Sequence, residues 1–368
     1  MRFTIHAPYR LPRNACPVSP APLSPAPRIA WHLRCVVTMA NPFAAATRRV
    51  RLPAMTMFVG AIDCGGTKTQ AALADRRGAV HFLPPQAGCN PQDGPAWQAR
   101  LSALMAAILR AGPLQAAVLG MAGHGEVPEH DRDTAALAVS LLGPGVRILN
   151  DVELALRAAF GDGEGVLVLA GTGSMAMAQG PRGIARAGGW GDLIGDEGSA
   201  NWIGARALRL AARALDGQGG DADFARALMA RLGVAPADDP TGPLRFAMAT
   251  DTPRAAIAQV AMQVDALALD RQPTAQAILA RGARHLARTA QAAARGAGLA
   301  APQPWSTAGS VMRSATLLAA LTVEMTAAPR PAQMTALGGG LRLAAQQAGW
   351  ALPPGWHARV AAATRAWA

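Results

Sequence analysis

The chain has 368 residues, which is long enough for two ordinary domains and a large core, and 51% of them are apolar. No uninterrupted run of about 18 apolar residues occurs, so the sequence predicts no membrane partner. The net charge of +12 is uneven, because residues 1–54 hold eight arginines and no acidic residue, leaving 12 − 8 = +4 for the rest. With no Lys/Arg track, we expect no nucleic-acid partner.

Residues 1–54 differ in composition from the rest of the chain, with nine prolines and no sustained periodicity. Such a segment cannot bury enough apolar surface to fold alone, so we expect it to be disordered. An arginine-rich transit peptide is one alternative, although the prolines disfavour an amphipathic helix. We favour the other alternative, in which translation begins at Met55 or Met57.

Short apolar runs then alternate with helix-like spacing, a pattern typical of an α/β domain. A turn at Asp75–Gly78 predicts a hairpin between the second and third runs. We expect strands at 57–63, 70–75, 79–83, 116–121 and 146–149, and helices at 95–111, 128–142 and 152–160.

The second half begins with the glycine-rich turn 161–165 and becomes largely Ala/Arg/Leu helix beyond residue 200. We expect strands at 166–170, 175–179 and 305–308, and helices at 254–270 and 274–296.

The order strand, glycine-hydroxyl loop, strand occurs twice, at 57–75 and 166–179. This duplication predicts two similar α/β lobes, each presenting a phosphate-binding hairpin. We place the first lobe at 55–161 and the helix-rich second lobe at 162–349. The sequence pattern leaves the tail at 350–368 ambiguous.

The first loop contains Lys68, the only lysine among 35 basic residues. It lies in Asp63-Cys64-Gly65-Gly66-Thr67-Lys68-Thr69, directly after the first apolar run. Backbone N–H groups of such a turn can approach a phosphate, and the preceding carboxylate can hold a metal ion.

The four cysteines, Cys16, Cys35, Cys64 and Cys89, form no Cys-x-x-Cys pair. Neither a zinc ribbon nor an iron–sulfur site is therefore predicted. We interpret the body of the chain as a reduced, cytoplasmic protein.

Five ordered motifs resemble the N-acetylglucosamine kinase family, within the wider BadF/BadG/BcrA/BcrD ATPase group of the actin-like, hexokinase-like superfamily. The resemblance runs from about Met57 to Gly349, and GGWGDLIGDEGSANWIG at 188–204 is its most specific part. It implies two actin-like ATPase (ribonuclease H-like) lobes with an interlobe nucleotide and sugar cleft. In this family the end of the chain can return to the first lobe, which would place 350–368 there. The motifs are Asp63–Thr69, Asn150-Asp151, Gly171–Ser174, Gly188–Ser199 and Gly309–Val311.

The resemblance implies an ATP-dependent kinase that uses Mg²⁺ and phosphorylates an amino sugar, N-acetylglucosamine or glucosamine, at its 6-hydroxyl. Phosphoryl transfer needs phosphates held by donors, a metal ion and a base for the attacking hydroxyl. Asp63 would lie near Mg²⁺, and Gly309 and Ser310 would pack against the adenosine. The phosphates would contact Gly65, Gly66, Thr67, Lys68, Gly171, Thr172, Gly173 and Ser174.

Asp151 is our candidate for the general base, since it ends a strand and matches the family's catalytic aspartate. An Asn-Asp pair before a helix is also a good N-cap, which is the structural alternative. Residues that would line the sugar pocket supply carboxylates for hydroxyls and an aromatic wall. They are Asn90, Gly123, Asp151, Gly189, Trp190, Asp196 and Glu197, with His124 as a weaker candidate for a second base.

Two other classes remain open. The first is an ATPase of the wider group that acts on a protein partner instead of a sugar. The second is a sensor on the same fold that has no enzymatic activity. The sensor would be expected to lose the base or a loop, and this chain keeps both. The Ala-rich helices would suit a homodimer as well as internal packing.

Overall fold

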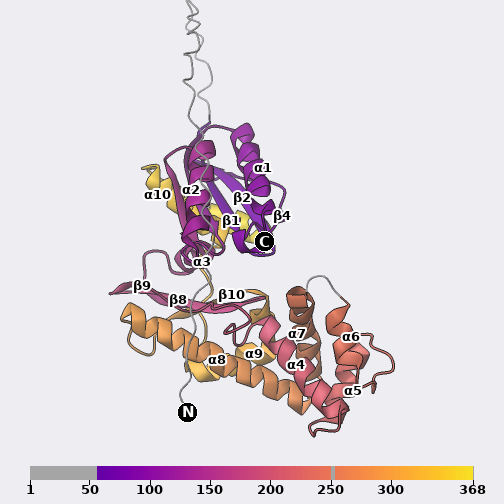
Figure 1. Cartoon of the computed structure of the whole chain (residues 1–368). Helices are drawn as coiled ribbons and strands as arrows, with labels where there is room; N and C mark the ends of the chain where they lie inside the picture. Colours follow the sequence, from indigo (N-terminus) through magenta and orange to yellow (C-terminus); the bar gives the residue numbers. More distant parts are fainter. Residues whose placement is uncertain (1–55, 250–252, 368) are drawn as a thin grey trace, which may run out of the picture. The chain divides into compact units, whose positions relative to one another are not determined.

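The computed structural model describes residues 56–249 and 253–367 and contains two sheets with their covering helices (Figure 1). The expectations for residues 1–54 therefore lie outside the described part of the chain. Among the residues described, no helix has the length and apolar character needed to cross a bilayer.

The first sheet has the order β3-β2-β1-β5-β6, and the short β4 also pairs with β2. β1 is antiparallel to β2 and parallel to β5, and β5 is parallel to β6. The strands are β1 (Phe58–Cys64), β2 (Lys68–Asp75), β3 (Val80–Phe82), β4 (Gln86–Ala87), β5 (Leu114–Met121) and β6 (Val146–Asn150).

Both faces of this sheet are covered, as the nearly continuous apolar sequence of β1 requires. Val59 and Ala61 face one core, while Ile62 faces another, following the alternation of side chains along a strand. The surrounding helical elements are η1 (Pro91–Asp93), α1 (Ala96–Ala111), α2 (Pro128–Leu142) and α3 (Asp151–Phe160).

The second sheet has the order β10-β7-β8-β9. α8 runs along one face (Figure 1), and α3 packs against the other through Val152 and Leu156. The strands are β7 (Gly165–Ala170), β8 (Ser174–Gly180), β9 (Gly183–Gly188) and β10 (Trp305–Ala308). The remaining helices are α4 (Ala200–Leu215), α5 (Ala222–Arg231), α6 (Gly242–Met248), α7 (Pro253–Leu269), α8 (Pro273–Ala297), η2 (Ser310–Arg313) and α9 (Ala315–Met325).

The two sheets repeat one arrangement. β1 has an antiparallel hairpin partner on one side and a parallel strand on the other, and β7 has the same two kinds of neighbour. The predicted α/β class with two similar strand–loop–strand units is therefore confirmed. The sequence analysis did not predict β4, β9, α5 or α6, which are short or lack a strong apolar period.

The last two helices, α10 (Ala336–Gln347) and α11 (Trp356–Trp367), contribute to the cores of the first sheet. A Cβ atom on Gly340 would lie 2.8 Å from the Cβ of Ala61 in β1. Trp356 Nε1 donates to the carbonyl of Asp75 at 3.0 Å. α10 therefore packs on the first sheet, although it follows the second sheet in the chain.

Candidate active site

The turn between β1 and β2 exposes its tip. The Gly65 N–H donates to the Lys68 carbonyl at 3.0 Å, closing the turn, while the side chains of Thr67 and Lys68 are exposed. The Gly88 N–H donates to the Thr67 carbonyl at 3.1 Å and supports the tip from the neighbouring loop. The predicted phosphate loop is thus a braced hairpin whose end is accessible to an anion.

Asp63 and Asp151 lie at the same edge of the first sheet. Asp63 pairs in register with Gly120 of β5, and Gly120 pairs with Leu149 of β6, two residues before Asp151. Carboxyl ends of neighbouring parallel strands meet at one edge, which is where ligands bind in open α/β sheets.

The N-cap of α3 is Asn150, not Asp151. Its Oδ1 accepts from the Val152 N–H at 2.9 Å, and its Nδ2 donates to the His124 carbonyl at 3.0 Å. Asp151 is the first residue of the helix and also accepts from the Val152 N–H at 2.9 Å. Asn150 therefore performs the capping role that was the structural alternative for Asp151.

Both carboxyl groups titrate close to neutrality. Burial raises the pKa of Asp151 to about 7, and the negative charge of Asp63 contributes to the same shift, while the Val152 N–H opposes it. Burial also raises the pKa of Asp63 to about 6, and the positive charge of Lys68 partly opposes this shift. A carboxylate with a pKa near the working pH is suited to accept a proton.

The edge offers the kind of donor that Mg²⁺ uses. Within the described ranges, no group of three or more His, Cys, Asp or Glu side chains could enclose a metal ion. Mg²⁺ rarely needs such a cage, because it commonly binds one or two carboxylates together with waters and substrate phosphates. Asp63 fits that donor set.

Asn90 and Gly123 lie side by side, as residues lining one predicted pocket should. Asn90 caps η1, with its Oδ1 accepting from the Gln92 N–H at 3.0 Å. Gly123 has φ of 76°, and a Cβ atom there would lie 3.2 Å from Asn90 Oδ1, so a larger side chain would disturb this contact.

A polar chain links this loop to the Gly188–Ser199 motif. Gln92 Nε2 donates to Glu126 Oε2 at 2.8 Å, and Glu126 Oε1 lies 2.9 Å from Arg186 Nη1. Arg186 Nη2 donates to the Gly189 carbonyl at 2.7 Å, and its guanidinium lies 5.9 Å from the Trp190 ring centre. Sequence reasoning missed Gln92, Glu126 and Arg186 because none belongs to a recognisable motif.

The second loop, Gly171–Ser174, is stabilised by hydrogen bonds to residues that follow it in the chain. The Ser174 N–H donates to Asp196 Oδ1 at 3.2 Å, and Ser174 Oγ donates to the Glu197 carbonyl at 2.9 Å. The Ala200 N–H donates to the Gly171 carbonyl at 2.8 Å, so the start of α4 is tied to the same loop.

Asp196 is almost fully buried, with 4% of its surface exposed. Its Oδ2 accepts from Arg254 Nη2 at 3.0 Å, so both oxygens already have partners. Burial raises the pKa of Asp196, against the opposing effects of the Ser174 N–H and Arg254. In this structure Asp196 braces the second loop, and its contact with sugar hydroxyls stays a prediction.

Gly309 brings the turn after β10 against the second loop. Its φ is 95°, and a Cβ atom there would lie 2.2 Å from the Ala170 carbonyl oxygen. Only glycine fits both the conformation and the approach. Ser310, which begins η2, is thereby placed beside the residues that start the Gly171–Ser174 loop.

The remaining candidates differ in their surroundings. His124 Nδ1 lies 2.9 Å from Asp131 Oδ1, which is the arrangement of a loop-ordering residue. Trp190 is 68% exposed and lies in the same loop as Leu193, which is 94% exposed. Such exposed apolar side chains are available to contact a ligand or another segment.

These features define a class of protein: duplicated α/β units of the actin-like ATPase type, with two glycine-hydroxyl loops and paired carboxylates at a sheet edge. Residues 59–332 match the model of the BadF/BadG/BcrA/BcrD ATPase family, and the chain belongs to that family.

Individual relatives agree with this assignment. The chain is similar to the structure of an inferred N-acetylglucosamine kinase from Chromobacterium violaceum, with 28% identity and a TM-score of 0.62 over 79% of this chain and 99% of that one. A second inferred N-acetylglucosamine kinase, from Porphyromonas gingivalis, shows the same fold, with 19% identity and a TM-score of 0.57 over 77% and 97% of the two chains.

A shorter match involves the N-acetylmuramic acid/N-acetylglucosamine kinase of Clostridium acetobutylicum, with 42% identity over 73 residues. This match covers 20% of the present chain and about a quarter, 24%, of that relative.

Proposed function

We propose that the protein is an ATP-dependent amino-sugar kinase that phosphorylates N-acetylglucosamine or glucosamine at the 6-hydroxyl. The observation that carries the proposal is Asp151, a half-buried carboxylate with a raised pKa at the sheet edge that also holds Asp63. The Asn90–Gly123 loop is tied to this edge through Asn150, which donates to the His124 carbonyl. Membership of an ATPase family supports ATP as the phosphoryl donor.

The proposed reaction uses the carboxylate form of Asp151. It accepts the proton of the sugar hydroxyl as that oxygen forms a bond to the γ-phosphorus. The bond between the γ-phosphorus and the β–γ bridging oxygen breaks, and ADP leaves with that electron pair. Asp63 would hold Mg²⁺, which neutralises phosphate charge when bound.

The two hairpin loops would hold the phosphates through backbone N–H and hydroxyl donors at Gly65–Lys68 and Gly171–Ser174. Gly309 and Ser310 would contact the adenosine. On the sugar side, Asn90, Gly123, Gly189 and Trp190 would surround the ring, with Asp196 and Glu197 near its hydroxyls.

A sugar acceptor is favoured over a protein acceptor by the relatives, since both structural relatives described above are inferred sugar kinases. We further propose that the enzyme works in the cytoplasm, in line with the reduced thiols Cys64 and Cys89.

The test is an ADP-release assay with Mg²⁺ and ATP, comparing no acceptor, glucosamine, N-acetylglucosamine, glucose and N-acetylmuramic acid. We expect one amino sugar to stimulate turnover and Asp151→Asn to lower kcat by about 10²–10⁴-fold, the usual contribution of a general base. Asp162→Asn is the matched control, since this carboxylate lies just beyond the same helix and is exposed. ATP turnover that no sugar stimulates would reject the sugar-kinase proposal.

A further inference from the structure

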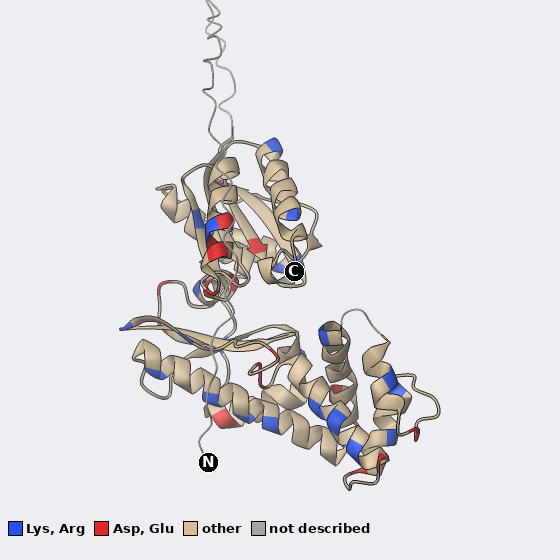
Figure 2. Cartoon of the chain, viewed as in Figure 1, with Lys and Arg blue, Asp and Glu red and all other residues tan. Residues whose placement is uncertain are grey.

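The outer faces of α4 and α8 carry a cluster of basic side chains that the proposed reaction does not use. On α4 the spacing is i, i+4, i+7 and i+11, and on α8 it is i, i+3, i+4 and i+7, so each set follows one helical face. Figure 2 shows arginines, in blue, along both helices. We call them the basic pocket: Trp202, Arg206, Arg209 and Arg213 on α4, and Arg281, Arg284, His285 and Arg288 on α8.

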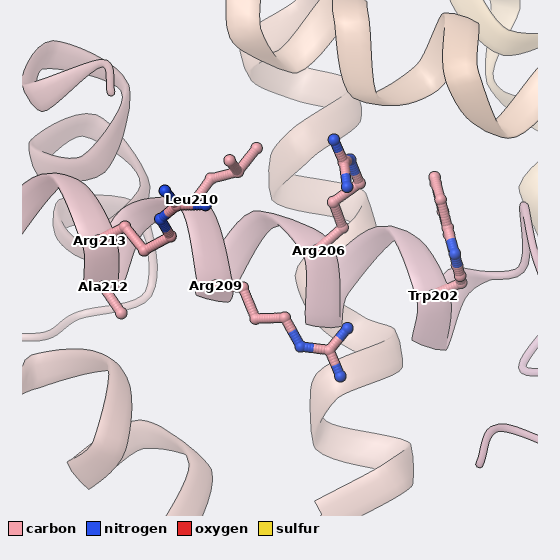
Figure 3. A pocket seen from close by; sticks show the side chains of 6 residues that line it. All are labelled: Trp202, Arg206, Arg209, Leu210, Ala212 and Arg213. Carbon is pink, nitrogen blue, oxygen red and sulfur yellow. The ribbon is translucent and has the colours of Figure 1, made fainter. Parts of the chain in front are cut away.

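Aromatic contacts join the two rows. The rings of Trp202 and His285 meet edge to face, with centroids 5.4 Å apart. The Arg206 guanidinium lies 5.8 Å from the Trp202 ring centre, and Figure 3 shows both side chains projecting to the same side of α4. A hollow of about 460 Å³ lies over α4 and one of about 250 Å³ over α8. The hollow over α4 has an apolar wall formed by Trp202, Leu210 and Ala212.

The positive charges crowd one another without a counterion. Across residues 56–249 and 253–367, none of the six arginines forms an ion pair with a carboxylate. Burial lowers the pKa of Arg206, and the neighbouring charges of Arg281 and Arg209 lower it further. Repulsion of this kind is unfavourable in the free protein and would be relieved by an anion.

His285 is affected by the same excess of positive charge. Burial lowers its pKa, and Arg281, Arg288 and Arg284 add to this effect, whereas the carboxylate of Glu197 opposes it. Glu197 opposes the charges of three arginines at this histidine, so positive charge is in excess there.

We propose that the basic pocket is a binding site for a small anion carrying two or more phosphate groups. Arginine forks bind phosphate oxygens in pairs, and several forks on two helices joined by the Trp202–His285 contact fit a ligand with several such groups. A nucleic acid fits less well, because it needs an extended basic track, whereas these residues are confined to two helical faces. The proposal does not depend on the kinase reaction.

The experiment is calorimetric titration of the full chain with inorganic pyrophosphate and tripolyphosphate, with sulfate at matched ionic strength as the reference anion. We expect saturable binding of both polyphosphates. The double variant Arg206→Gln/Arg281→Gln should weaken binding at least about tenfold, since two charge-assisted contacts are lost. The affinity of Arg206→Lys/Arg281→Lys should lie between those of the wild type and the double Gln variant, because lysine keeps the positive charge but lacks the two-pronged guanidinium.

Arg295→Gln is the matched control, since Arg295 is exposed in the last turn of α8, outside the basic pocket. It should bind as the wild type does. Circular dichroism verifies that each variant folds. The proposal is overturned if no saturable binding occurs, if the double variant binds normally, which would place the polyphosphate at the hairpin loops, or if Arg295→Gln weakens binding equally. Tighter binding of a short oligonucleotide than of tripolyphosphate would also overturn it.

Discussion

The two glycine-hydroxyl loops share a topology but differ in what surrounds them. The first follows Asp63 and lies beside Asp151, so its strand edge carries ionisable groups. The second follows Leu169-Ala170, has no carboxylate at its strand end, and is instead held by Asp196 and Gly309. The comparison suggests that the first unit supplies the charge for chemistry and that the second supplies fixed donors.

After the loss of the base Asp151, the next largest effect should come from Asp63, the charged end of the first strand. Asp63→Asn removes the carboxylate that we place beside Mg²⁺, and we expect kcat at limiting Mg²⁺ to fall on the order of 10²-fold. A Mg²⁺ titration should partly restore turnover. An unchanged Mg²⁺ dependence would show that the first loop does not supply the metal contact.

The second loop should instead respond through stability. Gly309→Ala forces a side chain into a positive φ and towards the Ala170 carbonyl, so we expect a loss of about 1–3 kcal/mol in the free energy of unfolding. Urea denaturation measures this loss, and the KM for ATP should rise in the same variant. Gly349→Ala is a control for the φ effect alone, because its φ is 65° and open space surrounds it.

Ionisation of Asp151 should lower the free energy of unfolding as the pH rises. The folded pKa of Asp151 is about 7 against an ordinary value of 3.8, so ionisation is disfavoured in the fold, and stability is lost between these two values as pH increases. Asp151→Asn cannot ionise and should be more stable than wild type, by at most about 4 kcal/mol at pH 8 and by less at pH 5.

Thermal melts in EDTA at both pH values measure this difference. The activity of the wild type should rise towards a plateau as the pH passes about 7, where Asp151 becomes a carboxylate. A difference in Tm that does not grow between pH 5 and pH 8 would contradict a raised pKa for Asp151.

The smallest effect should come from the ion pair between Glu126 and Arg186, which links the Asn90–Gly123 loop to the Gly188–Ser199 motif. Glu126→Gln and Arg186→Gln should each raise the KM for the sugar a few-fold, about 0.5–1 kcal/mol, with little change in kcat. The double variant should show less than the sum of the two effects, because the partners contact each other. Full additivity would mean that Glu126 and Arg186 act separately.

The sequence predicted the fold where local signals are strong. The apolar runs and glycine-hydroxyl loops indicated β1, β2, β7 and β8 to within a few residues, because strand period and turn chemistry are local properties. The motif order also indicated the family.

Tertiary structure decided the rest. Only strand register placed Asp63 and Asp151 at one edge, and only packing assigned α10 to the first sheet. The buried position of Asp196 and the link from Gln92 through Glu126 to Arg186 depend on contacts between residues far apart in the chain. Such contacts produce no periodic pattern in a single sequence. Candidate reactive residues such as Asp63 and Asp151 could therefore be predicted, whereas the residues that position the loops, such as Glu126 and Arg186, could not.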